Sequence, residues 1–121
     1  MKHCLIVDDS SSIRKVARRI LETVDIRTSE AETRADALDH CRNQMPDCVV
    51  VDWHMPDGDA LPFLVSLRAL PGGKKPTVMY LTSENDPLQV ARVMRSGADV
   101  HMMKPFDQAG LLAPLAEAGL V

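Results

Sequence analysis

The chain has 121 residues, a formal net charge of −3 at pH 7 and a hydrophobic content of 45%, and aromatic residues make up only 3% of it. This length suits one domain that buries most of its apolar surface. The weakly acidic balance gives no reason to expect nucleic acid as a partner. No apolar run approaches the ~20 residues that a membrane span needs, and the N-terminal apolar run is too short for a signal peptide. We therefore expect one cytoplasmic globular domain with an aliphatic core.

The three cysteines are Cys4, Cys41 and Cys48. Their number is odd, their spacing does not match a metal site, and two of them begin strand-like apolar runs. These features favour buried, reduced thiols in a cytosolic protein rather than a disulfide framework.

Strand-like and helix-like segments alternate along the chain. The expected strands span residues 4–7, 26–29, 48–52, 77–81 and 100–103. The first expected helix follows a capping cluster at residues 10–12. The other four expected helices span residues 33–45, 60–70, 87–96 and 107–118. In the first helix the apolar residues recur at helical spacing: Ile13, Val16, Ala17, Ile20, Leu21 and Val24. Five βα units without a linker or repeat predict one doubly wound α/β domain, although periodicity leaves the strand order open.

Four of these apolar runs end in polar residues that suit phosphate or metal chemistry. Asp8 and Asp9 follow the first run, Asp52 closes the third, Thr82 follows the fourth and Lys104 the fifth. The carboxyl ends of parallel strands gather at one edge of the sheet, where open α/β folds place their sites. Three carboxylates, a hydroxyl and an ammonium group would then face one another. This combination suits a divalent cation and a phosphoryl group.

The same residues also have purely structural interpretations. Asp8 and Asp9 could be caps of the first helix, where the helix dipole favours acids. Thr82 could cap the helix that follows it, and Lys104 could be a solvated surface lysine. The His54 ring beside Asp52 could bind a transition metal, but no second ligand with suitable spacing accompanies it. The joint occurrence at four strand ends favours the chemical interpretation.

Taken together, these motifs resemble the receiver domains of bacterial two-component response regulators, and among them the stand-alone chemotaxis (CheY-like) type. The resemblance covers essentially the whole chain, residues 1–121. It rests on the acidic pair after the first run, on Val-Asp-Trp-His-Met-Pro around Asp52, on Thr82, and on Lys104-Pro105-Phe106. It implies a flavodoxin-like (βα)5 fold with a doubly wound, parallel, five-stranded sheet in the order 2-1-3-4-5.

This resemblance implies a phosphorylation-activated signalling switch of a phosphorelay system. Asp52 would accept a phosphoryl group from a histidine kinase or a histidine phosphotransfer protein and would then change the affinity for an unknown downstream protein. The cofactor would be Mg²⁺, held by the side chains of Asp9 and Asp52, by Asp8 largely through water, and by the His54 backbone carbonyl. The chain would catalyse only its own phosphorylation and dephosphorylation. We expect a monomer, with a phosphorylation-dependent dimer as the alternative, and neither nucleic acid nor membrane as a partner.

The resemblance assigns further roles around the phosphoryl group. Lys104 would neutralise phosphoryl charge and Thr82 would donate a hydrogen bond to a phosphoryl oxygen. Pro105 resembles the cis-proline that aims the lysine inward in the family. His54 and Glu84, two positions after Asp52 and Thr82, are candidates for setting the lifetime of the phosphoryl group.

The chain departs from the family at three places. His101 stands where a switching Tyr or Phe is common, so the switch would use a polar ring that titrates near neutral pH. The Asp-Gly pair precedes Asp59 rather than falling at 59–60, so a different loop geometry is expected. Pro114 lies inside the last helix, which we expect to bend or to begin late.

Basic residues of the first helix form like-charged pairs at i, i+4: Arg14, Lys15, Arg18 and Arg19. They are expected to be a solvated face, or alternatively a docking surface for an acidic kinase or phosphotransfer helix bundle. Two other interpretations of the whole chain remain. One is a Mg²⁺-dependent phosphohydrolase with an Asp nucleophile, although His54 stands where such enzymes need a second acid. The other is the N-terminal receiver of a longer regulator with a separate effector domain.

Overall fold

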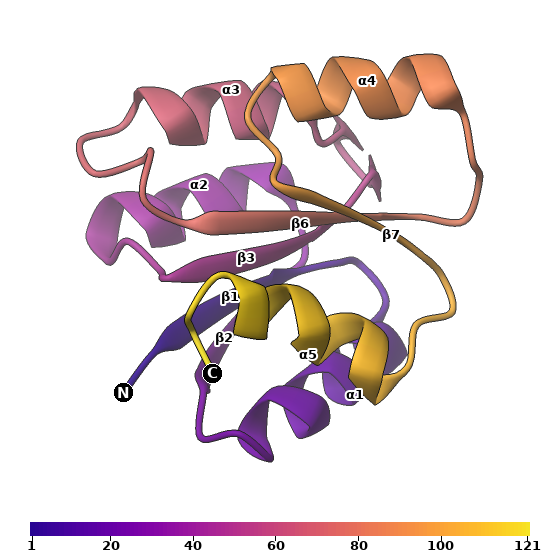
Figure 1. Cartoon of the computed structure of the whole chain (residues 1–121). Helices are drawn as coiled ribbons and strands as arrows, with labels where there is room; N and C mark the ends of the chain where they lie inside the picture. Colours follow the sequence, from indigo (N-terminus) through magenta and orange to yellow (C-terminus); the bar gives the residue numbers. More distant parts are fainter.

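The computed structural model describes all 121 residues. A five-stranded parallel sheet lies between two helical layers (Figure 1). The strands of this sheet are β1 (His3–Val7), β2 (Arg27–Ala31), β3 (Cys48–Asp52), β6 (Thr77–Thr82) and β7 (Val100–Met103). The helices are α1 (Ser11–Glu22), α2 (Arg34–Asn43), α3 (Leu61–Ala69), α4 (Pro87–Arg95) and α5 (Gln108–Glu117). Two further strands, β4 (His54–Met55) and β5 (Gly58–Asp59), form a separate antiparallel hairpin.

The strand order is β2-β1-β3-β6-β7, with every neighbouring pair parallel. With the hairpin set aside, this is the expected order 2-1-3-4-5, so the predicted fold is confirmed. The five expected strands and five expected helices all form, with bounds that differ by a few residues. The hairpin is the one element that the sequence patterns did not predict. None of the helices combines the length and hydropathy of a membrane-spanning helix.

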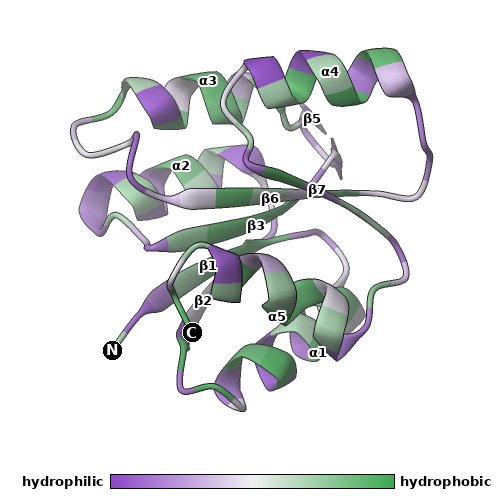
Figure 2. Cartoon of the chain, viewed as in Figure 1, coloured by the Kyte–Doolittle hydropathy of each residue, from purple (hydrophilic) through white to green (hydrophobic).

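The central strands are apolar on both faces because helices cover both faces of the sheet. Leu5, Val49 and Tyr80 belong to the core beneath α2, α3 and α4, whereas Ile6 and Val50 belong to the core beneath α1 and α5. Figure 2 shows the corresponding hydrophobic colouring of the sheet and of the inner helix faces. All three cysteines are buried and free, as expected.

Polar side chains cap the N-termini of most of the helices. Ser10 accepts from the Ile13 N–H at 3.3 Å at the start of α1, and Thr33, Asp86 and Asp107 cap α2, α4 and α5 in the same manner. Of the two outcomes expected from Pro114, a bend or a late start of α5, the late start is wrong. The Asp107 carboxylate lies 2.7 Å from the Gly110 N–H and sets the start at Gln108. The helix then continues through Pro114, because its buried leucines pack against the sheet.

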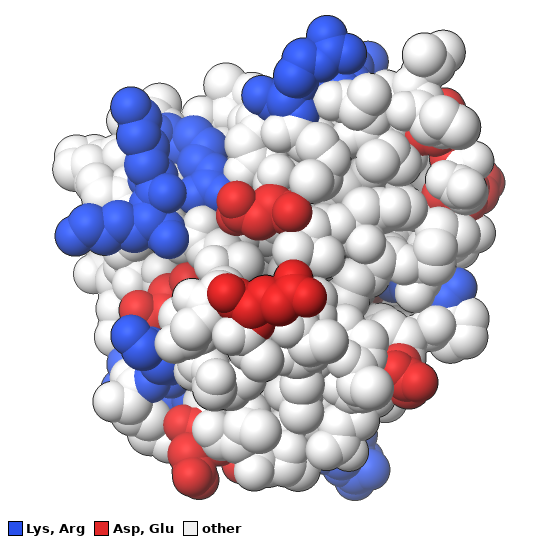
Figure 3. All heavy atoms as spheres, viewed as in Figure 1, with Lys and Arg blue, Asp and Glu red and all other residues white.

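The surface charge is mixed. In Figure 3 a group of basic side chains gathers at the left, where the connection between α3 and β6 lies in Figure 1. This is the side opposite the carboxyl ends of the strands, so the predicted site edge lies away from that basic group.

Truncation of a buried α3 side chain tests the two-layer core. Leu67 is fully buried beneath α3, whereas Val65 on the same helix is 54% exposed. We expect Leu67→Ala to lower the free energy of unfolding by about 2–5 kcal/mol, and Val65→Ala to change it by less than about 0.5 kcal/mol. Urea denaturation of both variants measures the difference. Equal effects of the two substitutions would contradict the assignment of the core face.

Candidate functional site

An acidic cluster lies at the carboxyl ends of β1 and β3. One carboxylate oxygen from each of Asp8, Asp9 and Asp52 lies within 4.8 Å of the others. The β1–β3 register pairs Val7 with Val51 and thereby places the two strand ends side by side. Asp8 and Asp52 are buried, whereas Asp9 is exposed. The cluster is therefore open to solvent at Asp9.

Lys104 enters this cluster from the end of β7. Its Nζ lies 2.9 Å from Asp8 Oδ2 and 3.1 Å from Asp52 Oδ1, and its side chain is 19% exposed. The Lys104–Pro105 peptide bond is cis, as the resemblance implied, and the Lys104 N–H donates to the Thr82 carbonyl at 2.8 Å. Burial alone would lower the pKa of Lys104, but the bonds to the two carboxylates raise it on balance. Lys104 is thus a paired cation and not a solvated surface lysine.

The pKa of Asp52 reflects its burial and its charged neighbours. Burial and the nearby Asp8 raise its pKa, while the hydrogen bond and charge of Lys104 act in the opposite direction and Asp9 adds to the rise. One ammonium group does not balance three carboxylates, so the site keeps an excess of negative charge. An all-carboxylate donor set with excess negative charge fits a hard divalent cation such as Mg²⁺.

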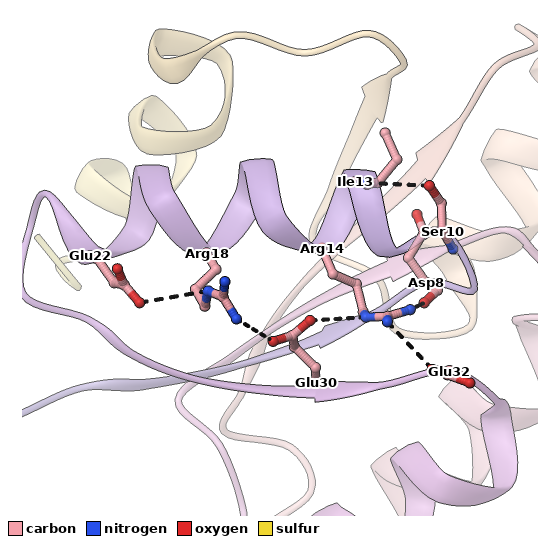
Figure 4. Close-up of polar contacts among 8 residues, drawn as sticks. All are labelled: Asp8, Ser10, Ile13, Arg14, Arg18, Glu22, Glu30 and Glu32. Atoms are coloured by element: carbon pink, nitrogen blue, oxygen red, sulfur yellow. Dashed lines mark hydrogen bonds and ion pairs between the residues drawn. The ribbon is translucent and has the colours of Figure 1, made fainter.

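Asp8 is held by three donors. Its Oδ1 accepts from the Ser10 N–H at 2.9 Å, its Oδ2 accepts from Lys104, and its backbone carbonyl accepts from Arg14 Nη1 at 2.7 Å. Figure 4 shows how Arg14 reaches from α1 to the loop that carries the acidic pair. The interpretation of Asp8 as the cap of the first helix is wrong, because Ser10 performs that function.

Arg14 belongs to a ladder of ion pairs between α1 and β2 (Figure 4). Arg14 pairs with Glu30 at 2.9 Å and with Glu32 at 3.4 Å, and its side chain is only 11% exposed. Arg18 pairs with Glu30 at 3.0 Å and with Glu22 at 3.8 Å. The expected solvated basic face is therefore wrong for Arg14, because acids on the polar edge strand neutralise it.

Lys15 and Arg19, by contrast, are exposed on α1, so the alternative of a docking surface concerns these two residues. The largest hollow of the surface, about 650 Å³, lies beside the ladder and not at the acidic cluster. It is lined by residues of α1, of the end of β2 and of α2, and Asp52 is not among them.

The hydroxyl of Thr82 is turned toward β7 and the following loop. It lies 2.6 Å from the Glu84 carbonyl, to which it donates, and 3.0 Å from His101 Nε2. Because a hydroxyl has one proton to donate, His101 Nε2 acts as the donor to the Thr82 oxygen. The imidazole ring stacks on Tyr80 with ring centroids 4.7 Å apart, and burial lowers the pKa of His101. Asp86, and not Thr82, caps the helix that follows.

His54 lies exposed in the hairpin after β3, and Glu84 lies exposed in the loop after β6. His54 belongs to the hairpin that follows Asp52, and its ring is not part of the acidic cluster. The tip of that hairpin contacts Arg34 of α2. No sequence pattern singled out Arg34; the displaced Asp-Gly pair at 57–58 was the only indication of an unusual loop there.

Residues 4–116 match the response regulator receiver domain family. The transcriptional regulatory protein KdpE of the KDP operon from Escherichia coli is 33% identical over 121 residues, and PhoB of the phosphate regulon from Klebsiella pneumoniae is 29% identical over 112 residues. These alignments cover 98% and 93% of this chain, but 51% and 49% of the relatives. The chain thus spans about half the length of these curated relatives.

Solved structures of similar proteins share the fold over almost the whole chain. Chemotaxis response regulator CheY4 of Vibrio cholerae has a TM-score of 0.90 and 27% identity, and the match covers 97% of this chain and 98% of that one. A CheY-like receiver domain protein from Methanospirillum hungatei has a TM-score of 0.88 and 25% identity, with 98% and 93% covered.

The raised pKa of Asp52 predicts that its ionised carboxylate destabilises the metal-free fold. Because the folded pKa lies above the unfolded value, stability falls as the pH rises through the folded pKa, and the loss is absent below about pH 4. We expect Asp52→Asn to melt at a higher temperature than wild type at pH 7 in EDTA, with the difference vanishing at low pH.

Asp39→Asn is the control for this measurement. Asp39 is 69% exposed on α2, so its substitution should change stability by less than about 0.5 kcal/mol. A lower melting temperature of Asp52→Asn at pH 7 would show that pairing with Lys104 outweighs burial and the neighbouring acids.

Proposed function

The chain belongs to the family of response regulator receiver domains, which are phosphorylation-activated switches, and on this premise we propose that Asp52 is its phosphoacceptor. The observation that carries the proposal is the position of Asp52. It ends the central strand β3, it lies in the acidic cluster, and its Oδ1 is 3.1 Å from the ammonium group of Lys104. A carboxylate so placed is a nucleophile beside a cation that can receive phosphoryl charge.

In the proposed reaction an Asp52 carboxylate oxygen attacks the phosphorus atom of a phosphohistidine. The new O–P bond forms as the P–N bond breaks, and the donor imidazole leaves and takes up a proton. Lys104 moves its hydrogen bond from the carboxylates to the phosphoryl oxygens and compensates their charge. Little covalent chemistry is required of the protein beyond this positioning, as is usual for phosphoryl transfer.

We propose Mg²⁺ as the cofactor, held by Asp8, Asp9, Asp52 and the backbone carbonyl of His54. The three clustered carboxylates and their excess negative charge support this assignment. With a divalent cation bound there, the negative charge of the three carboxylates would be offset, which would favour the approach of an anionic phosphoryl group. The exposed Asp9 leaves the cluster accessible from solvent.

The switch would act through Thr82 and His101. The Thr82 hydroxyl donates to the Glu84 carbonyl and not toward Asp52, so reaching a phosphoryl oxygen requires it to turn away from His101. The imidazole, which already stacks on Tyr80, would then lose its acceptor and move into the vacated space. This movement would alter the surface near β7 and α4, which an unidentified downstream protein would recognise.

The remaining assignments follow from the family. We propose that a histidine kinase or a histidine phosphotransfer protein supplies the phosphoryl group and that the exposed side chains of His54 and Glu84 tune its loss. The three buried free cysteines support a cytoplasmic location. A stand-alone chemotaxis-type regulator is one context; the N-terminal receiver of a longer regulator, as the length of KdpE and PhoB suggests, is the other.

Labelling with acetyl phosphate and Mg²⁺ tests the phosphoacceptor. Wild type is expected to gain the mass of one phosphoryl group, and Asp52→Asn none, because an amide is not a competent nucleophile. Intact-protein mass spectrometry measures the gain, and Asp39→Asn, which changes an exposed acid on α2, should label like wild type. Equal labelling of Asp52→Asn and wild type would remove Asp52 from its proposed role.

The pH dependence of activation tests His101. Deeper burial in the active state favours the neutral imidazole, because burial lowers the pKa of a histidine. Binding of beryllofluoride, a phosphoryl mimic, should therefore strengthen between about pH 5.5 and 8, by at most about tenfold per unit of pKa difference between the two states. Fluorescence of Trp53, the only tryptophan, reports binding. His101→Phe should flatten this pH profile. An unchanged profile in this variant would show that His101 does not take part in activation.

A further inference from the structure

The hairpin is short and begins two residues after Asp52 of the acidic cluster. In it His54 pairs with Asp59 and Met55 pairs with Gly58. One backbone hydrogen bond, from the Ala60 N–H to the Trp53 carbonyl at 3.0 Å, joins the two ends of the segment. A two-stranded ribbon of this length is not stable on its own, so other contacts must hold it.

Those contacts come from the first residues of α2. Arg34 Nη1 donates to the Asp59 carbonyl at 3.0 Å, Nη2 donates to the Asp57 carbonyl, and Nε lies 3.3 Å from Asp57 Oδ1. The backbone N–H groups of Arg34 and Ala35 donate to the two Asp57 carboxylate oxygens at 3.2 and 3.4 Å. They are the only hydrogen bonds that a sequence-distant element makes to residues 54–59.

Gly58 at the tip of the hairpin is fitted to this contact. Its φ of +125° is a backbone conformation that other residues rarely adopt, and a Cβ atom there would lie 2.9 Å from Arg34 Nη2. The glycine therefore provides both the turn and the space for the guanidinium group. This explains why the Asp-Gly pair stands at 57–58 in this chain.

The negative charge of Asp57 strengthens the contact between the hairpin and α2. Burial acts to raise its pKa, but the backbone N–H groups of Arg34 and Ala35 and the charge of Arg34 lower it on balance. The ionised carboxylate also lies at the N-terminus of α2, where the helix dipole favours an anion. Asp57 thus docks the hairpin onto a helix that is itself part of the core.

We propose that Arg34 is a positioning residue of the divalent-cation site, which fixes the backbone at His54 by clamping the opposite strand of the hairpin. This inference rests on the proposed function, because the His54 backbone carbonyl acts as a metal ligand only if the acidic cluster binds the cation. The path is short: Arg34 holds the Asp59 carbonyl, and Asp59 pairs directly with His54. Loss of groups that orient a metal ligand typically weakens metal binding by about 10–100-fold.

A Mg²⁺ titration followed by Trp53 fluorescence tests the proposal, since Trp53 lies between Asp52 and the hairpin. We expect Arg34→Ala to raise the Kd for Mg²⁺ by about tenfold. Arg34→Lys should raise it similarly, because an ammonium group cannot bridge two carbonyls as a guanidinium does. It provides a second measurement if Arg34→Ala is poorly folded. Asp9→Ala gives the loss of Mg²⁺ affinity expected when a metal ligand itself is removed.

Arg68→Ala is the matched control. Arg68 also clamps backbone carbonyls, those of Gly73, Pro76 and Gly97, but it does so at the opposite end of the sheet. Its loss should lower the melting temperature and leave the Kd for Mg²⁺ unchanged. Wild-type Mg²⁺ affinity in both Arg34 variants, or equal weakening in Arg68→Ala, would overturn the positioning role alone. Absence of Mg²⁺ binding and of phosphoryl gain in wild type would instead overturn the proposed function, and the positioning role with it.

Discussion

The ammonium group of Lys104 between Asp8 and Asp52 is the interaction on which the site depends. It joins the ends of β7, β1 and β3, and Lys104 and Asp8 are 96 positions apart in the chain. Two buried carboxylates at adjacent strand ends would repel each other without a cation, because burial makes unpaired charge costly. Lys104 removes only part of that repulsion, and the proposed divalent cation would offset the remainder. Structural stability and the proposed chemistry thus have the same electrostatic origin.

Two arginines extend this arrangement into the surrounding loops. Arg14 donates to the carbonyl of Asp8 in the loop after β1, and Arg34 donates to the carbonyls of Asp57 and Asp59 in the loop after β3. Both start from the first turns of helices that pack on opposite faces of the sheet. The planar guanidinium group suits this task because it presents several donors in a fixed geometry. Loops that carry functional groups are in this way tied to rigid elements.

The alternation of apolar runs and helical stripes was sufficient to predict a doubly wound α/β domain, whereas the strand order followed from the family resemblance. Both kinds of pattern are local consequences of burial: a central parallel strand is apolar throughout, and a covering helix is apolar on one stripe. The late start expected for the last helix failed because the cap at Asp107 and the packing of buried leucines outweigh one lost hydrogen bond at Pro114. The hairpin could not be predicted, because strands of two residues have no measurable period and this one depends on Arg34.

For the site, the sequence by itself determined which residues stand at the strand ends, and therefore that Asp8, Asp9, Asp52 and Lys104 meet. This follows because the carboxyl ends of parallel strands lie at the same edge of the sheet. Only the tertiary structure decided the partners of longer or rotatable side chains. Whether the Thr82 hydroxyl faces Asp52 or His101, and whether Arg14 is solvated or buried, depends on rotamers and on acceptors brought near by folding. Such choices are made between residues distant in the chain, and no local periodicity encodes them.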